Sequence, residues 1–218
     1  MAKGIIFDLD GTMVDNMMIH HRAWQKKLAE MGLFLELEEV KEKIHGINEE
    51  ILHRLFGDRF TAEERRRISW EKEALYREIY LPELRPVDGL VELLEGFYDR
   101  NIPIGIGTAA PIENMNFVLD NLDIRRMIHT AQHAGDVKKG KPDPEIYLNV
   151  SEAMGIDPGK CIIFEDTPTG ADAASRAGSK VVVVTTTHEP AEFEHIPSII
   201  RFIKDYREIS VGELLSSP

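Results

Sequence analysis

The sequence predicts an α/β fold in which a doubly wound, Rossmann-like parallel sheet carries an inserted all-helical domain. Short apolar segments alternate with amphipathic helical patterns along most of the chain, which is typical of a parallel sheet covered by helices on both faces. One long stretch early in the chain instead shows helical patterns only. We therefore expect an α/β core at residues 1–14 and 87–218, with a helical cap domain at residues 15–86.

The strand predictions depend on short apolar runs that are bounded by turn residues. The clear candidates are residues 4–7, 102–107, 161–164 and 180–184, and the weaker ones are residues 128–131 and 198–202. Helical patterns separate these runs, at residues 89–98, 112–122, 144–154 and 169–177. Helical crossovers are therefore available for the parallel pairings that a doubly wound sheet requires.

The inserted segment, at about residues 16–80, is helical in pattern almost throughout. Thr61 and Glu64 form a capping-box pattern that opens a long charged helix. Trp24 and Trp70 are expected to pack inside this helical domain rather than to face a substrate. The segment thus indicates a separate helical cap that interrupts the α/β core after its first strand.

Composition limits the kinds of partner that the chain can bind. The formal net charge is −12, whereas nucleic acids and anionic membranes require clustered positive charge. We therefore expect neither nucleic acid nor a membrane as a partner. A phosphorylated small molecule stays compatible with an acidic chain, because a bound cation reverses the local field of an acidic site.

Several features favour a cytoplasmic protein. The single cysteine, Cys161, lies in an apolar run and excludes an intrachain disulfide. Asp8 and Asp10 interrupt the first apolar run, so no signal-peptide pattern is present. No apolar stretch approaches the roughly 20 residues of a membrane span. The sequence does not settle the oligomeric state, and we favour a monomer.

Polar residues follow the predicted strands at their carboxyl ends, where open parallel sheets bind ligands. These residues are Asp8, Asp10, Thr108, Glu165 and Asp166, and Lys141 precedes a helix at the same rim. Four crowded carboxylates repel one another by several kcal/mol at intermediate dielectric, which favours a bound divalent cation. Because every acidic ligand offers oxygen, the expected cation is Mg²⁺.

The same residues suit phosphoryl transfer. Mg²⁺ with an adjacent lysine and a threonine hydroxyl forms a receptor for the equatorial oxygens of a phosphoryl group. A carboxylate close to that phosphorus can attack it and form an acyl phosphate. A second aspartate two positions further on can serve as the acid for the leaving oxygen and then as the base for water.

Four sequence motifs occur in the order that is typical of one known superfamily. They are Asp8-x-Asp10-Gly11-Thr12, Thr108, Gly140-Lys141-Pro142 and Glu165-Asp166. Together they resemble the motifs of the haloacid-dehalogenase-like hydrolases, and the resemblance extends to about residue 184. The chain is most similar to the group of β-phosphoglucomutase and sugar phosphatases, which carries its helical cap directly after the first motif.

The resemblance implies a role for each matching residue. Asp8 would be the nucleophile and a Mg²⁺ ligand, and Asp10 would be the acid and base and lend its carbonyl to the metal. Asp166 would bind the metal directly, whereas Glu165 would bind it directly, act through water or only organise the site. Thr108 and Lys141 would hold the transferring phosphoryl group. Substrate contacts are expected from His20, Lys72, Gly46 and Ala109.

The expected activity is Mg²⁺-dependent hydrolysis of a small phosphorylated metabolite, such as a sugar phosphate, through an aspartyl-phosphate intermediate. The nearest alternative is a phosphosugar mutase of the β-phosphoglucomutase type. Against it, aligning the cap loops places Glu49 where that enzyme has an arginine for the distal phosphate, and Ala110 replaces a serine. A one-residue shift of that alignment would bring in Arg54 instead.

Two further alternatives are weaker. A haloacid dehalogenase needs neither a metal cluster nor the second acid, so Asp10 and Asp166 count against it. A non-catalytic phospho-ligand module, such as a receiver domain, also gathers Asp, Thr and Lys at a sheet rim. Receiver domains lack an acid two residues after the acceptor and have no helical cap.

Overall fold

The computed structural model describes residues 2–216 and divides the chain into two compact units. The first, called the α/β unit below, runs to Asp15 and resumes at Leu84. The second, called the helical unit, comprises Asn16–Glu83. The chain therefore leaves the α/β unit soon after its first strand and returns to it before its second.

A six-stranded parallel sheet forms the centre of the α/β unit, in the order β3-β2-β1-β4-β5-β6. The strands are β1 Gly4–Phe7, β2 Ile104–Gly107, β3 Thr130–Gln132, β4 Cys161–Glu165, β5 Lys180–Val184 and β6 Ile199–Ile203. The strands β2, β1 and β4 end at the same level of the sheet, since Phe7 pairs with both Ile106 and Phe164. The residues that follow these strands consequently lie at one edge, where the strand order reverses around β1.

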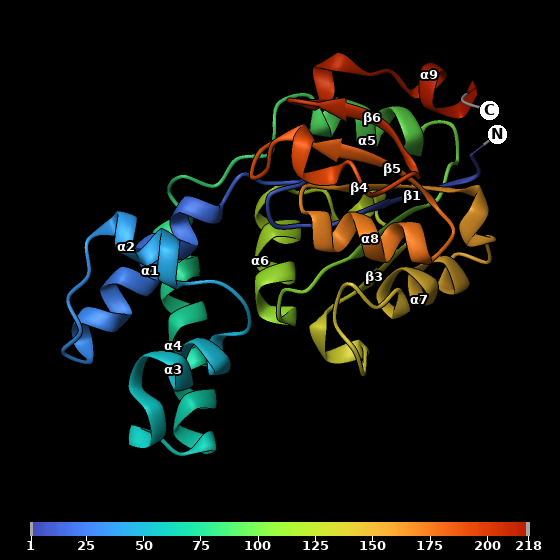
Figure 1. Cartoon of the computed structure of the whole chain (residues 1–218). Coiled ribbons are helices and arrows are strands. Elements are labelled where there is room, and N and C mark those ends of the chain that lie inside the picture. Colours follow the sequence, from blue (N-terminus) through green and yellow to red (C-terminus); the bar gives the residue numbers. More distant parts are fainter. Residues whose placement is uncertain (1, 217–218) are drawn as a thin grey trace. The chain divides into compact units, whose positions relative to one another are not determined.

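Helices cover both faces of this sheet, as right-handed crossovers in opposite directions from β1 require (Figure 1). The helices of the α/β unit are α5 Leu90–Tyr98, α6 Ile112–Asn121, α7 Glu145–Ala153, α8 Pro168–Arg176 and α9 Val211–Ser216. Ile6, Ile163 and Val181 point from the sheet into an apolar cluster with α7 and α8. On the opposite face, Phe7 and Phe164 stack at 4.6 Å beside Tyr206. The predicted Rossmann-like fold class is confirmed.

Single 3₁₀ turns join several of these elements. They lie at Gly57–Arg59, Arg125–Met127, Ala134–Asp136, Pro158–Lys160, Pro190–Phe193 and Tyr206–Glu208. Most of the predicted elements begin one or two residues away from their predicted starts, and two of these shifts have a local chemical cause. β2 begins two residues late, directly after Pro103, which has no N–H to donate to the sheet. α8 begins one residue early, at Pro168, because the Thr167 hydroxyl caps it by accepting the Gly170 N–H at 3.1 Å.

The helical unit contains α1 Met17–Glu30, α2 Leu37–Lys43, α3 Asn48–Phe56 and α4 Ala62–Tyr80. Trp24, Leu28 and Ile68 belong to its apolar core. The capping box of Thr61 and Glu64 forms as predicted, with both reciprocal hydrogen bonds in place.

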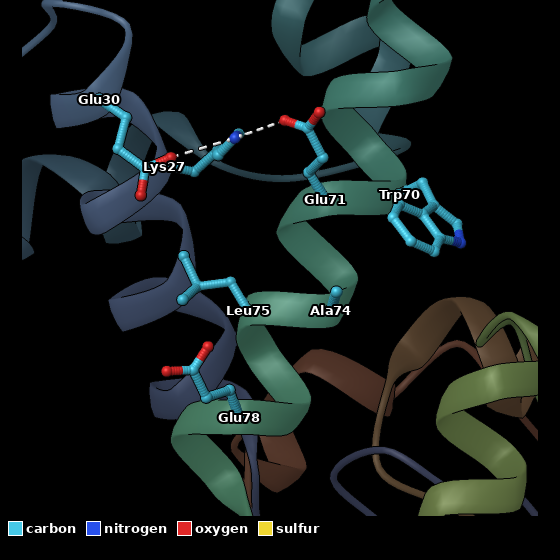
Figure 2. A pocket seen from close by; sticks show the side chains of 7 residues that line it. All are labelled: Lys27, Glu30, Trp70, Glu71, Ala74, Leu75 and Glu78. Carbon is cyan, nitrogen blue, oxygen red and sulfur yellow. Dashed lines mark hydrogen bonds and ion pairs between the residues drawn. The ribbon is translucent and has the colours of Figure 1, made fainter.

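The prediction that Trp70 packs inside the helical unit is wrong. Trp70 is 60% exposed and points away from α1 (Figure 2). Four of the five buried positions of α4 are four residues apart and form one stripe: Ile68, Lys72, Tyr76 and Tyr80. Two residues after Ile68, at about 100° per residue, Trp70 falls on the opposite side of the helix.

Within residues 2–216, no helix combines the length and the apolar character needed to cross a membrane.

Candidate active site

Asp8, Lys141 and Glu165 form a buried ion-pair cluster at the carboxyl edge of the sheet. Asp8 follows β1, and its N–H donates to the carbonyl of Phe164 on β4 at 2.9 Å. The Lys141 Nζ lies 2.5 Å from Asp8 Oδ1 and 2.6 Å from Glu165 Oε1. One ammonium group therefore links two carboxylates at the carboxyl ends of adjacent strands, Asp8 after β1 and Glu165 at the end of β4.

Glu165 is fixed through both of its carboxylate oxygens. Oε1 accepts the hydroxyl of Tyr147, on α7, at 2.7 Å in addition to the ammonium of Lys141. Oε2 accepts the backbone N–H groups of Asp166 and Thr167 at 3.0 and 3.1 Å, and the Thr167 hydroxyl at 3.2 Å. This carboxylate is therefore held by protein donors on every side.

Asp166 is held more loosely, by one hydroxyl on each oxygen. The Thr12 hydroxyl donates to Oδ1 at 3.1 Å, and the Thr187 hydroxyl lies 2.6 Å from Oδ2. Gly11 allows the first-motif loop to approach closely, since a Cβ there would lie 2.1 Å from Asp166 Oδ2. Its φ of +79° also favours glycine, so both geometry and space explain this residue in the motif.

Asp8, Glu165 and Asp166 each offer a carboxylate oxygen, and these three oxygens lie within 4.8 Å of one another. Burial raises the pKa of Asp8 well above its usual range, and the carboxylates of Glu165 and Asp166 add to that rise. Burial, with the Glu165 carboxylate beside it, raises the pKa of Asp166 to about 7. Three buried acids around one ammonium group thus leave a surplus of negative charge.

The charges of Lys141 and Glu165 stabilise each other. Burial alone would lower the pKa of Lys141, but the carboxylates of Asp8 and Glu165 outweigh it and raise that pKa. Burial likewise opposes ionisation of Glu165, while Lys141 and the hydrogen bonds from Tyr147 and Thr167 bring the pKa of Glu165 below its ordinary value. Lys141 is consequently a fixed cation beside Asp8.

The other predicted residues of the α/β unit lie at the same edge. Thr108 follows β2 and is buried, and its hydroxyl accepts the Ala110 N–H at 3.0 Å. Ala109, between them, is exposed. Asp10 is half-buried, and within residues 2–216 its carboxylate is not part of the three-carboxylate group.

Comparison with known proteins identifies the family. A model of the haloacid dehalogenase-like hydrolases matches residues 2–178. The chain belongs to this family. A validoxylamine A 7'-phosphate phosphatase from Streptomyces hygroscopicus subsp. limoneus is 28% identical over 97% of this chain and 99% of that protein. A phosphorylated carbohydrates phosphatase from Thermotoga maritima is 30% identical over 81% of this chain and 82% of that protein.

A solved structure extends the likeness over nearly the whole chain of this hydrolase. The crystal structure of a β-phosphoglucomutase from Clostridium difficile matches it with a TM-score of 0.82 and 26% sequence identity. The match covers 98% of this chain and 96% of that one.

In the helical unit of the hydrolase, the structure brings two predicted substrate-binding residues together and sets the third apart. The Lys72 Nζ lies 2.9 Å from His20 Nδ1 and 2.9 Å from Glu73 Oε1. The His20 ring stacks on Tyr76 with the ring centroids 3.9 Å apart. Gly46 lies in the exposed loop between α2 and α3, with a φ of +92°. Their roles toward a substrate stay predictions.

The helical unit also carries a surface cavity of about 220 Å³ between α1 and α4 (Figure 2). Lys27 lies there, paired with Glu30 and Glu71 at 3.1 and 2.6 Å. Leu75 and Glu78 also line this cavity. The residues that line it include none of the predicted site residues.

The sequence interpretation did not include two residues that contact the cluster. Thr187 comes shortly after β5, so the strand-end rule applied to that strand would have found it. Tyr147 lies in α7, six residues after Lys141, and no local motif marks it. Only the packing of α7 against the sheet reveals that its hydroxyl reaches Glu165.

Proposed function

We propose that this hydrolase is a Mg²⁺-dependent phosphatase that acts on a small phosphorylated metabolite, in particular a sugar phosphate. The observation that carries the proposal is the buried Asp8 carboxylate, placed beside the Lys141 ammonium and near Asp166 at the carboxyl edge of the sheet. The substrate class is supported by the relatives, which include a phosphatase named for phosphorylated carbohydrates.

The residues at this edge fit Mg²⁺. Three buried carboxylates with one ammonium group carry surplus negative charge, and their oxygens are the ligands that this ion prefers. Asp8 and Asp166 would hold the ion with the main-chain carbonyl of Asp10, and Glu165 is the remaining candidate ligand. When bound, Mg²⁺ would neutralise the phosphate oxygens and so favour attack by an anion.

The chain's own groups would carry out the transfer in two steps. Asp8 attacks the phosphorus in line with the leaving oxygen, so that a bond to its carboxylate oxygen forms as the ester bond breaks. Lys141 and the Thr108 hydroxyl bind the phosphoryl oxygens. Asp10 gives its proton to the leaving oxygen and then takes one from the water that attacks the phosphorus. Inorganic phosphate leaves, and the Asp8 carboxylate is regenerated.

Asp10→Asn is expected to separate substrates by their leaving groups. An asparagine cannot protonate the departing oxygen, so hydrolysis of a sugar phosphate should fall by about 10²–10⁴-fold. Hydrolysis of p-nitrophenyl phosphate should fall far less in its first step, because that leaving group needs no proton. The pre-steady-state burst of the released sugar or p-nitrophenol measures the rate of this first step. An equal fold-loss of that rate on both substrates would show that Asp10 is not the acid.

A phosphosugar mutase is the second candidate, and the likeness to β-phosphoglucomutase over nearly the whole chain favours it. A mutase must bind a bisphosphate, which needs a cation for the distal phosphate. Glu49, in the first turn of α3, would repel that phosphate. The guanidinium of Arg54 donates to the carbonyls of Lys43 and His45 at 2.8 and 2.9 Å, which gives Arg54 a structural role in the loop. These residues support the phosphatase.

The products formed in a single reaction mixture distinguish a phosphatase from a mutase. We expect β-glucose 1-phosphate, supplied with Mg²⁺ and catalytic glucose 1,6-bisphosphate, to yield inorganic phosphate faster than glucose 6-phosphate. A panel of sugar phosphates, nucleotides and pyrophosphate, assayed for phosphate release, identifies the preferred substrate class. Glucose 6-phosphate forming much faster than inorganic phosphate would overturn the proposal in favour of the mutase.

A further inference from the structure

Tyr147 is a buried residue whose hydroxyl and ring both contact the charged cluster. The side chain is fully buried on α7, and its hydroxyl donates to Glu165 Oε1 at 2.7 Å. The Lys141 Nζ lies 4.8 Å from the centroid of the Tyr147 ring. Lys141 therefore has Glu165 Oε1 on one side and an aromatic face on another, a favourable environment for an ammonium group.

The hydrogen bonds to Glu165 leave it little capacity to bind a metal ion. A carboxylate has about four lone-pair directions, and Glu165 already accepts from five donors. Two of these donors are backbone N–H groups directly after β4, and they cannot turn away. A cation could reach Glu165 only by displacing one or more of these donors.

Asp8 and Asp166 differ from Glu165 in this respect. Asp8 accepts the ammonium of Lys141 through Oδ1, and Asp166 accepts one threonine hydroxyl on each oxygen. Both carboxylates therefore keep acceptor capacity that Glu165 lacks. The carboxylate oxygens that can still bind a cation are therefore those of Asp8 and Asp166.

We propose that Tyr147 is a positioning residue that, through Glu165, holds Lys141 against the phosphoryl site, and that Glu165 is not a metal ligand. Tyr147 and Glu165 together fix where the ammonium group lies, and Mg²⁺ contacts Asp8 and Asp166. The proposal rests on the proposed function in assuming that the site binds Mg²⁺ and that Lys141 binds the phosphoryl group.

The test separates metal binding from phosphate binding by titration calorimetry. Tyr147→Phe removes the hydroxyl and keeps the ring. We expect its Mg²⁺ dissociation constant to stay within about twofold of the wild-type value. Its dissociation constant for inorganic phosphate, measured at saturating Mg²⁺, should rise by about threefold to tenfold, the scale of one ordinary hydrogen bond, because the lost bond acts on the phosphate only through Glu165 and Lys141. Tyr98→Phe, at a half-exposed tyrosine on α5, is the matched control.

Glu165→Gln and Asp166→Asn complete the comparison. Asp166→Asn should weaken Mg²⁺ binding by more than tenfold, and Glu165→Gln should weaken it much less while weakening phosphate binding more than Tyr147→Phe does. A loss of Mg²⁺ affinity in Glu165→Gln equal to that in Asp166→Asn would overturn the proposal. Unchanged phosphate affinity in Tyr147→Phe would overturn it as well. Both titrations measure binding, so they test this proposal even if the protein hydrolyses no phosphate ester. Absence of hydrolysis would count against the proposed function and not against this proposal.

Discussion

Asp8→Asn is expected to lower phosphatase activity by about 10⁴–10⁶-fold, as loss of a covalent nucleophile does. An amide has no anionic oxygen with which to attack phosphorus. The variant should still fold, because its amide oxygen can accept the hydrogen bond that Lys141 now donates to Asp8 Oδ1 at 2.5 Å. The measurement is Mg²⁺-dependent release of p-nitrophenol from p-nitrophenyl phosphate, with thermal unfolding to check the fold.

The matched control is Asp99→Asn, which changes an exposed aspartate at the end of α5 and should keep full activity. Chelation of Mg²⁺ should inactivate the wild-type enzyme to a comparable degree, and added Mg²⁺ should restore it. Full activity of Asp8→Asn, or of the wild type in excess chelator, would contradict the proposed mechanism.

Lys141→Met is expected to lower the free energy of unfolding by about 3–5 kcal/mol, in addition to abolishing activity. The methionine fills the volume of the lysine stem but leaves Asp8 and Glu165 buried without their shared cation. Removing one partner of a buried ion pair costs more than the pair itself contributes, since the remaining charge is neither solvated nor compensated. Urea unfolding monitored by circular dichroism measures the change.

Lys139→Met provides the control for this prediction. Lys139 lies two residues away with a side chain that is 76% exposed, so its replacement should leave stability unchanged within error. Mg²⁺ should restore part of the stability of Lys141→Met, because the ion supplies positive charge at Asp8 and Asp166. Equal stability of the two variants would show that Lys141 does not neutralise the cluster.

Sequence reasoning predicted the fold class because hydrophobic periodicity determines it. β-strand runs such as residues 4–7 and 180–184 are short, apolar and bounded by turns, and the structure has strands with the same bounds. Asp8 and Asp166 could be placed at one edge because parallel strands end together. Trp70 differs from its prediction because its hydrophobicity indicates burial, whereas the period of its helix places it on the exposed face.

Side-chain networks could not be predicted in the same way. The five hydrogen bonds to Glu165 depend on the local turn after β4 and on the rotation of α7, which brings Tyr147 to within 2.7 Å of Glu165 Oε1. Neither the conformation of that turn nor the rotation of α7 can be predicted from the spacing of residues in the sequence. The sequence therefore leaves the role of Glu165 open, whereas the structure distinguishes a saturated carboxylate from one that keeps acceptor capacity.

The covalent intermediate tests the central claim most directly. The Asp10→Asn enzyme, which should break down an aspartyl phosphate slowly, is mixed with Mg²⁺ and excess p-nitrophenyl phosphate, quenched with acid within one turnover and digested. Mass spectrometry of the peptide that contains Asp8 should then show the mass of one added phosphoryl group, reducible by borohydride at that residue. A phosphoryl group on another residue, or none on Asp8 while p-nitrophenol is released in a stoichiometric burst, would contradict the claim that Asp8 is the nucleophile.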